Sequence, residues 1–419
     1  MSGNQVQASI AMTSATPRTF PSSITRSGLY LFAFTLPISH VPAQLGIALA
    51  FAGWLLEGLV NKHWQVRRHF FFIPLTVYLA WNVVAAALSP RALHSLGAVV
   101  DNEWPVIMML MLFWTVRDTR MLIRIVQTFL VSSAVAMLYA LWQVWGGVEL
   151  SRGLALTPMG TGYYRAVGFY GFYLTFAGFA MSVFFLSLAF VSELGGKERW
   201  RYGVGALLSF LAVVGTFARS IWLSFGAAIP LFAFMKSRRL GIIVTVVLVA
   251  FVATGILLVP TLYDRALSIV DVSQNETRLN LWTSALSMAK DHPVVGVGQD
   301  NWDYFFAQYR VEGGYYDTIV HPHNDYLTAL VSGGVVGLAC FVALWGITLV
   351  VGVQTARRSP DPYLRAIALG ATFSIFGFLI GSFFQNYYGT FVNCLGWWFM
   401  VGLVFTAFRF SSPPSGKVQ

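Results

Sequence analysis

The chemically reactive residues of this chain interrupt stretches that are otherwise apolar. Residues 321–325 read His-Pro-His-Asn-Asp, directly before a long apolar stretch. A neutral histidine can accept a proton from a hydroxyl group, which makes His323 a candidate general base. Asn324 and Asp325 can orient its ring or bind sugar hydroxyls, although Asn324 also suits a helix N-cap. Zinc binding by His321, His323 and His292 is an alternative, but no clustered cysteine or carboxylate completes the ligand set.

Arg219 lies in the middle of the apolar stretch 203–235. A chain reversal at this residue leaves two arms of about 16 residues, or roughly 25 Å each, so they barely cross a bilayer. The guanidinium is therefore expected within one leaflet. Such arginines usually face a cavity and a partner, because burial in hydrocarbon costs about 2.5–3.5 kcal/mol on insertion scales. The alternative is an arginine that snorkels to lipid phosphates.

Four further candidates are arginines on the same side of the expected membrane as Arg219. Their guanidinium groups can bind phosphate oxygens in pairs and stabilise a departing diphosphate without a metal ion. Each of them alone is also consistent with an ordinary surface ion pair. These candidates for binding a diphosphate or glycan are Arg165, Arg265, Arg278 and Arg310.

The composition indicates what kind of element must position these side chains. Hydrophobic residues make up 57% of the 419 residues and charged residues only 11%, which excludes a soluble domain. Apolar runs near the length of a membrane-spanning helix recur along the chain. The sequence therefore predicts an all-α integral membrane protein with about twelve spans, at 27–42, 43–60, 70–88, 105–116, 125–145, 167–191, 203–218, 220–235, 240–260, 324–353, 366–384 and 391–408.

The basic residues predict the orientation of these spans. Alternate connections collect 19 of the 27 lysines and arginines, and the positive-inside rule makes that side cytoplasmic. Both tails, 1–26 and 409–419, are then cytoplasmic, and all the candidate residues lie on the outer side. Residues 1–26 lack the features of a cleaved secretory signal, so the first helix is expected to be an uncleaved anchor. The net charge of +10 thus reflects membrane orientation, and no nucleic-acid partner is expected.

The predicted organisation has spans 1–9 in residues 27–260, an outward loop in 261–322, and spans 10–12 in 323–408. Residues 275–290 read as a helix capped by Asn275 or Thr277, and 301–311 as a second helix. The first predicted helix has an apolar face of Leu279, Trp282, Leu286 and Ala289. The second has an apolar face of Trp302, Phe305, Phe306 and Tyr309. Two amphipathic helices at a membrane surface suggest a lid over a site.

Three motifs in residues 205–345 resemble those of the superfamily of O-antigen ligases, O-antigen polymerases and protein O-oligosaccharyltransferases. Residues 216–223, Thr-Phe-Ala-Arg-Ser-Ile-Trp-Leu, resemble its T-x-S-R-x-x-W-L signature, with Ala218 in place of serine. Arg278 and Trp282, followed by residues 293–298 (Pro-Val-Val-Gly-Val-Gly), resemble R-x-x-x-W and P-h-x-G-h-G. Residues 323–327 with Gly334 are similar to H-N-x-x-L-x6-G.

The resemblance implies an inverting membrane glycosyltransferase of the GT-C type that needs no metal ion or other cofactor. His323 would be the catalytic base, while Arg219 and Arg278 would hold the diphosphate of an undecaprenyl-diphosphate-linked O-antigen. The acceptor would be a hydroxyl group of the lipid A-core oligosaccharide, and the reaction would take place at the periplasmic face of the bacterial inner membrane. Arg165, Arg265 and Arg310 match no motif and are placed by location alone.

Three alternatives share part of this pattern. An O-antigen polymerase uses the same donor with a glycan acceptor. A protein O-oligosaccharyltransferase glycosylates a protein. A transporter of lipid-linked glycans would be expected to carry charges deep in several spans and an internal repeat, and no repeat is visible here.

Overall fold

The computed structural model describes residues 20–411, except 63, 161, 259, 261–262, 265–266, 269–270, 272–274 and 317. The described residues are mainly helical. The N-terminal half contains α1 (Phe20–Thr35), α2 (His40–Asn61), α3 (Phe72–Ala87), α4 (Ala92–Glu103), α5 (Val106–Thr115), α6 (Thr119–Gly146) and α7 (Tyr173–Glu193). The remainder contains α8 (Gly196–Gly215), α9 (Arg219–Lys236), α10 (Arg238–Leu258), α12 (Glu276–Asp291), α13 (Trp302–Tyr309), α14 (Asp325–Arg358), α15 (Pro362–Gly381) and α16 (Phe391–Ser411).

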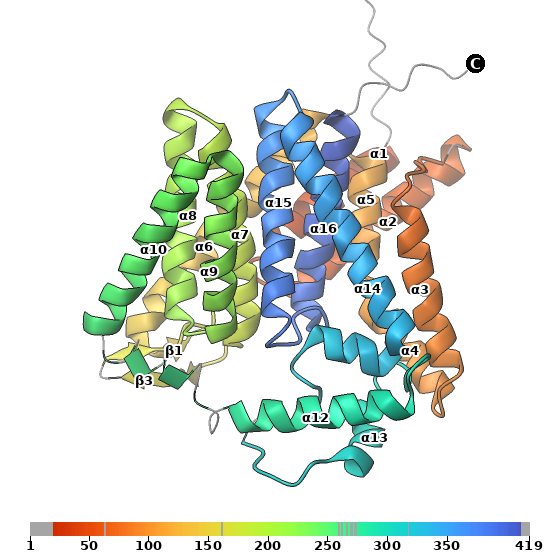
Figure 1. Ribbon diagram of the computed structural model, residues 1–419. Coiled ribbons are helices and arrows are strands. Elements are labelled where there is room, and N and C mark those ends of the chain that lie inside the picture. The colour runs from red at the N-terminus through yellow and green to blue at the C-terminus, as the bar shows by residue number, and fades with distance from the viewer. Residues whose placement is uncertain are drawn as a thin grey trace, which may run out of the picture.

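The long helices stand side by side, with α12 and α13 lying across one end of the bundle (Figure 1). Helices α7, α15 and α16 form its centre, because between 78% and 89% of the most apolar stretch of each is buried. Helix α10 is peripheral. Only 6% of its most apolar stretch is buried, and it packs against α9. A helix that is apolar all round but exposed is stable in hydrocarbon, where its backbone is satisfied internally.

The helices confirm an all-α membrane protein. Seven of those described are long and apolar enough to cross a membrane, or eight if the bent pair α4 and α5 is one span. Each of the twelve predicted spans contains helix, but α1, α3, α5, α8 and α9 do not meet that criterion alone. The number twelve therefore remains a prediction.

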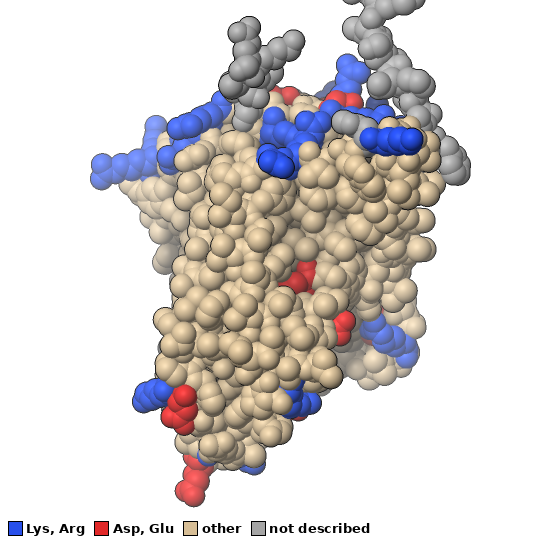
Figure 2. Space-filling model, turned by 90° about the vertical axis from the view of Figure 1, so that its right-hand side faces the viewer, with Lys and Arg blue, Asp and Glu red and all other residues tan. Residues whose placement is uncertain are grey.

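The distribution of charge agrees with a membrane-embedded middle. Figure 2 shows lysines and arginines gathered at one end of the molecule, fewer charged residues at the other, and a largely uncharged band between them. In a membrane-spanning protein the two ends of this band contact water, whereas charged side chains within the band raise the free energy of insertion.

Two of the differences between the predicted spans and the observed helices lie at prolines. The first predicted span runs across the turn of residues 36–39, which separates α1 from α2. Pro37 lies in this turn, and proline is disfavoured inside a helix because it lacks the N–H donor. Helix α4 was not predicted, and it meets α5 at a bend of 42° beside Pro105.

A small extended region connects α6 to α7. Strands β1 (Val148–Glu149) and β2 (Leu154–Ala155) pair antiparallel, as do β3 (Pro158–Gly160) and β4 (Tyr163–Tyr164). Burial opposes ionisation of the Glu149 carboxyl. Hydrogen bonds from Ser151, Tyr139 and the Arg152 backbone outweigh it and hold the pKa of Glu149 below its usual range. The region then joins the bundle where Ala166 N–H donates to the carbonyl of Gly215, at 2.9 Å.

Helix α14 is broken at Gly334, whose φ of 66° and ψ of −167° are non-helical. The break leaves carbonyls without helical partners, and residues 293–298 supply the missing bonds. Val297 N–H donates to the Val331 carbonyl at 2.8 Å, and Val335 N–H donates to the Pro293 carbonyl at 2.8 Å. A Cβ at Gly334 would lie 2.1 Å from the Val294 oxygen. The glycine is therefore required by close backbone contact as well as by its φ angle.

The two helices predicted in the outward loop are present as α12 and α13. Asn275 occupies the N-cap position of α12, but without a capping side-chain bond. The predicted apolar face of α12 is wrong in part, because Leu279 and Leu286 are 42% and 48% exposed. The buried face is instead Leu281, Ala285 and Met288, which pack with Trp302 and Phe306 of α13. The predicted face of α13 is confirmed, since Phe305 and Tyr309 pack against the same cluster.

Candidate active site

His323 lies two residues before α14. The carbonyl of the preceding Pro322 accepts a bond from Trp282 of α12, the helix that crosses one end of the bundle (Figure 1). The φ of His323 is 52°, a left-handed conformation uncommon for a residue with a side chain. The residue is 4% exposed. A buried, strained histidine is held by its surroundings, and such strain concentrates at functional sites.

Both ring nitrogens of His323 face oxygen atoms. Nδ1 lies 2.8 Å from Oε1 of Gln385. Nε2 lies 2.9 Å from the carbonyl oxygen of Thr318 and 3.3 Å from its hydroxyl oxygen. Both of these carbonyl oxygens accept, and a neutral imidazole has one N–H, so it donates to only one of them. In the tautomer whose Nδ1–H donates to Gln385, Nε2 carries the lone pair and faces the Thr318 carbonyl without a hydrogen bond to it. A substrate hydroxyl that replaces the Thr318 carbonyl at Nε2 would then meet a base.

The ring partner Gln385 belongs to residues 382–390, the loop between α15 and α16. Asp325 holds this loop. Its carboxylate accepts bonds from the Ser382 hydroxyl and from the backbone N–H groups of Tyr387 and Tyr388, at 2.5, 2.9 and 3.0 Å. A buried carboxylate is stable only when donors surround it.

The structure gives Asn324 and Asp325 contacts that bear on their predicted roles. Asn324 is an N-cap, since its side-chain oxygen accepts from Leu327 N–H at 3.0 Å, and its amide donates to the Phe383 carbonyl. Asp325 is buried, 3% exposed. Both residues bind the 382–390 loop, and through it they act on the ring, because Gln385 and not Asp325 is the residue hydrogen-bonded to Nδ1. Their bonds to distant backbone were not apparent from the sequence.

Arg219 is the first residue of α9 and is partly buried. The predicted reversal is confirmed, since α8 ends at Gly215. Phe217, in the turn, has a left-handed φ of 52°. The Arg219 guanidinium donates to the backbone carbonyl and to the hydroxyl of Ser268. A guanidinium at a helix N-terminus adds to the partial positive charge already there, so this position favours an anion.

Tyr387 links this position to two more arginines. Its hydroxyl lies 2.7 Å from the Ser220 hydroxyl, next to Arg219 in the chain. Burial raises the pKa of the Tyr387 phenol, as does the neighbouring Tyr173, while the hydrogen bond with Ser220 and the positive charge of Arg278 on α12 lower it. The Arg165 guanidinium lies over the Tyr173 ring, 4.1 Å from its centroid. Tyr387 is therefore linked, directly or through Tyr173, to the segments that carry three arginines distant in sequence.

Arg165 is poorly compensated. Its Nε is buried without a hydrogen-bond partner among the described residues. Burial lowers the pKa of its guanidinium, although the nearby Tyr173 opposes this effect. A bound anion would remove the desolvation cost of that charge.

Trp282, in the R-x-x-x-W motif, has a positioning role. Its indole N–H donates to the Pro322 carbonyl at 2.9 Å, directly before His323. Arg278 lies one turn earlier on the same helix. Helix α12 thus fixes an arginine and the histidine segment relative to each other.

The remaining candidates lie elsewhere. Arg310 is exposed and lies over the Tyr315 ring, 4.7 Å from its centroid. Arg265 falls outside the described residues. His292 ends α12 against Phe305, whereas the His321 and His323 rings contact each other. Within the described ranges, no group of three histidine, cysteine or acidic residues has a metal-binding arrangement.

The sequence analysis missed Gln385 and Tyr387. The available signal was a polar run, Gln-Asn-Tyr-Tyr at 385–388, between two apolar spans. Buried polar groups require partners, so a polar run in so short a connection indicates bonds to another segment.

Part of the chain is similar to known proteins. Residues 204–342 match the family model described as O-Antigen ligase. This part of the chain is therefore similar to the O-antigen ligase family. A curated relative, the O-antigen ligase of Pseudomonas aeruginosa, is 25% identical over 176 residues. The similarity covers 42% of this chain and 39% of the relative.

The segment that matches the family model, residues 204–342, contains Arg219, Arg278 and His323. Arg165, Gln385 and Tyr387 lie outside it. The candidate site thus joins the family segment to two other parts of the chain.

Proposed function

We propose that the protein is an inner-membrane O-antigen ligase. It transfers O-antigen from undecaprenyl diphosphate to a hydroxyl group of the lipid A-core oligosaccharide. The observation that carries the proposal is that the three motif segments are joined at one end of the bundle. His323 contacts Gln385 and Ser220 contacts Tyr387 in residues 382–390, while Trp282, one turn after Arg278, donates to Pro322 beside His323.

The reaction requires one proton acceptor and compensation for one leaving group. His323 Nε2 takes the proton of the acceptor hydroxyl, and the oxygen attacks the anomeric carbon. The bond from that carbon to the diphosphate oxygen breaks, and undecaprenyl diphosphate leaves from the opposite face. Attack opposite the leaving group inverts the anomeric configuration.

The arginines stabilise the leaving diphosphate. Arg219, Arg278 and Arg165 are fixed cations in a partly buried setting, where electrostatic stabilisation is stronger than in water. Each guanidinium can bind two phosphate oxygens, so the group can replace a metal ion.

The donor lipid has an apolar groove available beside Arg219. A pocket of about 490 Å³ lies between α8, α9 and α10, lined by residues that include Trp222, Phe225 and Phe251. Trp222 is one helical turn after Arg219. A prenyl chain attached to a diphosphate at Arg219 can therefore enter this groove directly.

The distribution of charge supports an orientation with this site at the periplasmic face. The end opposite the site carries most lysines and arginines (Figure 2), and cytoplasmic ends of membrane proteins are enriched in them. Both termini are then cytoplasmic, and the fold is of the GT-C type. The predicted lid, 261–322, contributes Arg278 and Trp282 to the site.

The decisive experiment uses purified protein with labelled carrier-linked glycan and three acceptors: lipid A-core, glycan and a protein. Transfer to lipid A-core alone supports the ligase. Chain extension of glycan would indicate a polymerase, and a labelled protein would indicate a protein O-oligosaccharyltransferase. Movement of the glycan across a vesicle membrane without transfer would indicate a transporter.

The same assay in excess chelator tests the role of the arginines. We expect an undiminished rate, because fixed guanidinium groups supply the positive charge. Loss of activity with EDTA and recovery with Mg²⁺ or Mn²⁺ would contradict a metal-independent mechanism.

A further inference from the structure

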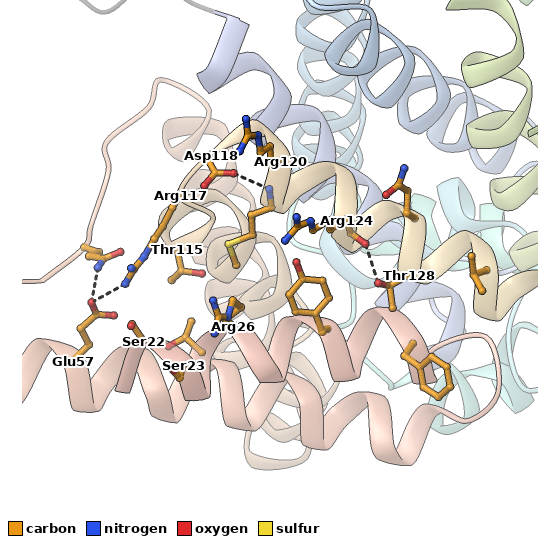
Figure 3. A pocket seen from close by; sticks show the side chains of 17 residues that line it. Ser22, Ser23, Arg26, Glu57, Thr115, Arg117, Asp118, Arg120, Arg124 and Thr128 are labelled. Carbon is orange, nitrogen blue, oxygen red and sulfur yellow. Dashed lines mark hydrogen bonds and ion pairs between the residues drawn. The ribbon is translucent and has the colours of Figure 1, made fainter. Parts of the chain in front are cut away.

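A second site lies at the opposite, basic end of the bundle. A pocket of about 990 Å³ opens between α1, α2 and α6, and four arginines line it (Figure 3). These are Arg26 on α1, Arg117 before α6, and Arg120 and Arg124 on α6. This pocket contains none of the residues of the candidate active site.

The two carboxylates that line the pocket are engaged. Glu57 Oε1 lies 3.4 Å from Arg117 Nη2 and accepts a bond from Gln65 at 3.0 Å. Asp118 caps α6 by accepting from Met121 N–H at 2.8 Å. Among the described residues, Arg26, Arg120 and Arg124 have no carboxylate partner. The pocket thus has an excess of positive charge suited to a phosphate group.

The lining changes from cationic to apolar along both helices. On α1, residues at intervals of four are Arg26, Tyr30 and Phe34. On α6, Arg120 and Arg124 are followed by Gln127, Thr128 and Val131. Residues at these spacings share one helix face.

The two gradients are in register. The Ser132 hydroxyl donates to the Phe34 carbonyl, so the apolar ends of both series lie at the same depth. Figure 3 shows Arg26 and Arg124 entering the space between the two helices. Beyond the pocket, Val135 and Leu138 continue the exposed apolar surface of α6.

We propose that this pocket binds an anionic phospholipid from the leaflet at the basic end. The phosphate lies among Arg26, Arg120 and Arg124, the glycerol region contacts Tyr30 and Thr128, and an acyl chain follows Phe34 and Val131. A soluble phosphate compound would contact only the cationic end of the pocket, whereas a lipid would contact both the cationic and the apolar end. With the orientation proposed above, this is the cytoplasmic leaflet.

Native mass spectrometry of the full chain in detergent can test the site with phosphatidylglycerol and phosphatidylcholine as probes. The test variant is the triple Arg26→Gln, Arg120→Gln, Arg124→Gln. We expect it to bind phosphatidylglycerol about a hundredfold more weakly than the unmodified protein, because each arginine should raise the affinity about fivefold. The single Arg124→Gln variant, with a milder expected loss, covers the case in which the triple variant is unstable.

The matched control is Arg199→Gln, Arg201→Gln, Arg239→Gln, which removes three exposed charges from other helices. Its affinity for phosphatidylglycerol should change less than about threefold, since distant surface charges are screened. Equal losses in both triple variants would overturn the site, as would unmodified affinity in the test variants. Equal binding of phosphatidylcholine, or full competition by soluble glycerol phosphate, would overturn the lipid assignment.

Discussion

At the scale of single residues, the two non-glycine positions with left-handed backbone in the family motifs are Phe217 and His323. Phe217 lies two residues before Arg219, and His323 is itself the proposed base. Each conformation costs of order 1–3 kcal/mol and persists only where surrounding contacts enforce it. At His323 those contacts are the hydrogen bond to Gln385, the contact of Nε2 with Thr318, and the bond from Trp282 to Pro322. The side chains that would react are thus preorganised by the fold.

The His323→Ala variant should lose transfer by about 10²–10⁴-fold, the usual contribution of a general base. Initial rates in the lipid A-core assay measure the loss, and size-exclusion chromatography checks that the protein remains folded. The matched control is His321→Ala, which removes the neighbouring imidazole and should be milder. Near-normal turnover of His323→Ala would rule out the general-base role, and equal losses would favour a paired role for both histidines.

The Gln385→Leu variant tests the residue that orients the ring. Removing one hydrogen bond worth about 0.5–1.5 kcal/mol should lower kcat by about tenfold or less. The KM for the donor should be unchanged, because Gln385 contacts His323 and none of the three arginines linked to Tyr387. A rise in KM with unchanged kcat would instead assign Gln385 to substrate binding.

The Arg219→Lys variant should be nearly as impaired as Arg219→Ala. A lysine retains the charge but cannot bind two phosphate oxygens in a planar fork. The kcat/KM for carrier-linked glycan is the relevant measurement. Full activity with lysine would mean that charge alone is sufficient at this position.

At the scale of elements, the break in α14 explains why glycine is required at one position in each of two motifs of this chain. Gly296 and Gly334 approach each other so closely that a Cβ on Gly296 would lie 2.6 Å from the Gly334 nitrogen. This contact joins the segment after α12 to α14 near its start. The glycines of the motifs are therefore structural, while the arginines and the histidine are the groups proposed to act on substrate.

The Gly334→Ala variant should lower the free energy of unfolding by at least about 2 kcal/mol, because alanine is strained at this φ and its Cβ meets the Val294 oxygen. Thermal unfolding in detergent measures the effect. Gly346→Ala is the control on the same helix, where an added Cβ has no neighbour within 4 Å. The control should be neutral or slightly more stable. Equal stability of both variants would show that the break tolerates a side chain.

The sequence predicted the elements better than their contacts. The reversal at Arg219 and helices α12 and α13 followed from local apolar patterns and helix-stop signals. The break at Gly334 did not, because it depends on bonds from residues 293–298, about 40 positions earlier. The 382–390 loop was also missed, since its burial depends on Asp325. Of the candidate site, the three motif residues were predicted from the sequence, but Gln385, which contacts the ring of the proposed base, was not.

At the scale of the whole molecule, a buried carboxylate ties the N-terminal half to the site. Glu103 accepts hydrogen bonds from Tyr78 at 2.8 Å and from Tyr388 at 2.6 Å. Tyr388 belongs to the 382–390 loop, which Asp325 holds from the other side. The first helices therefore support the loop that orients His323, although they carry no family motif.

The proposed orientation predicts opposite labelling at the two ends. In a background lacking Cys340 and Cys394, Lys290→Cys should react with a membrane-impermeant maleimide in intact spheroplasts. Lys197→Cys should react only after the membrane is opened. Both positions are exposed, so accessibility depends on the side of the membrane. The reverse pattern would invert the topology and place the candidate site in the cytoplasm.

The dependence of the site on residues 382–390 also has a consequence for biosynthesis. A chain emerges from the ribosome N-terminus first, so all three motifs are made before α15 and α16. Until that last pair of helices is inserted, Asp325 lacks the donors that surround it, and His323 lacks Gln385. A nascent chain would thus carry the motifs without an organised site. Catalytic competence would arrive with the final helices, after the rest of the bundle is already in the membrane.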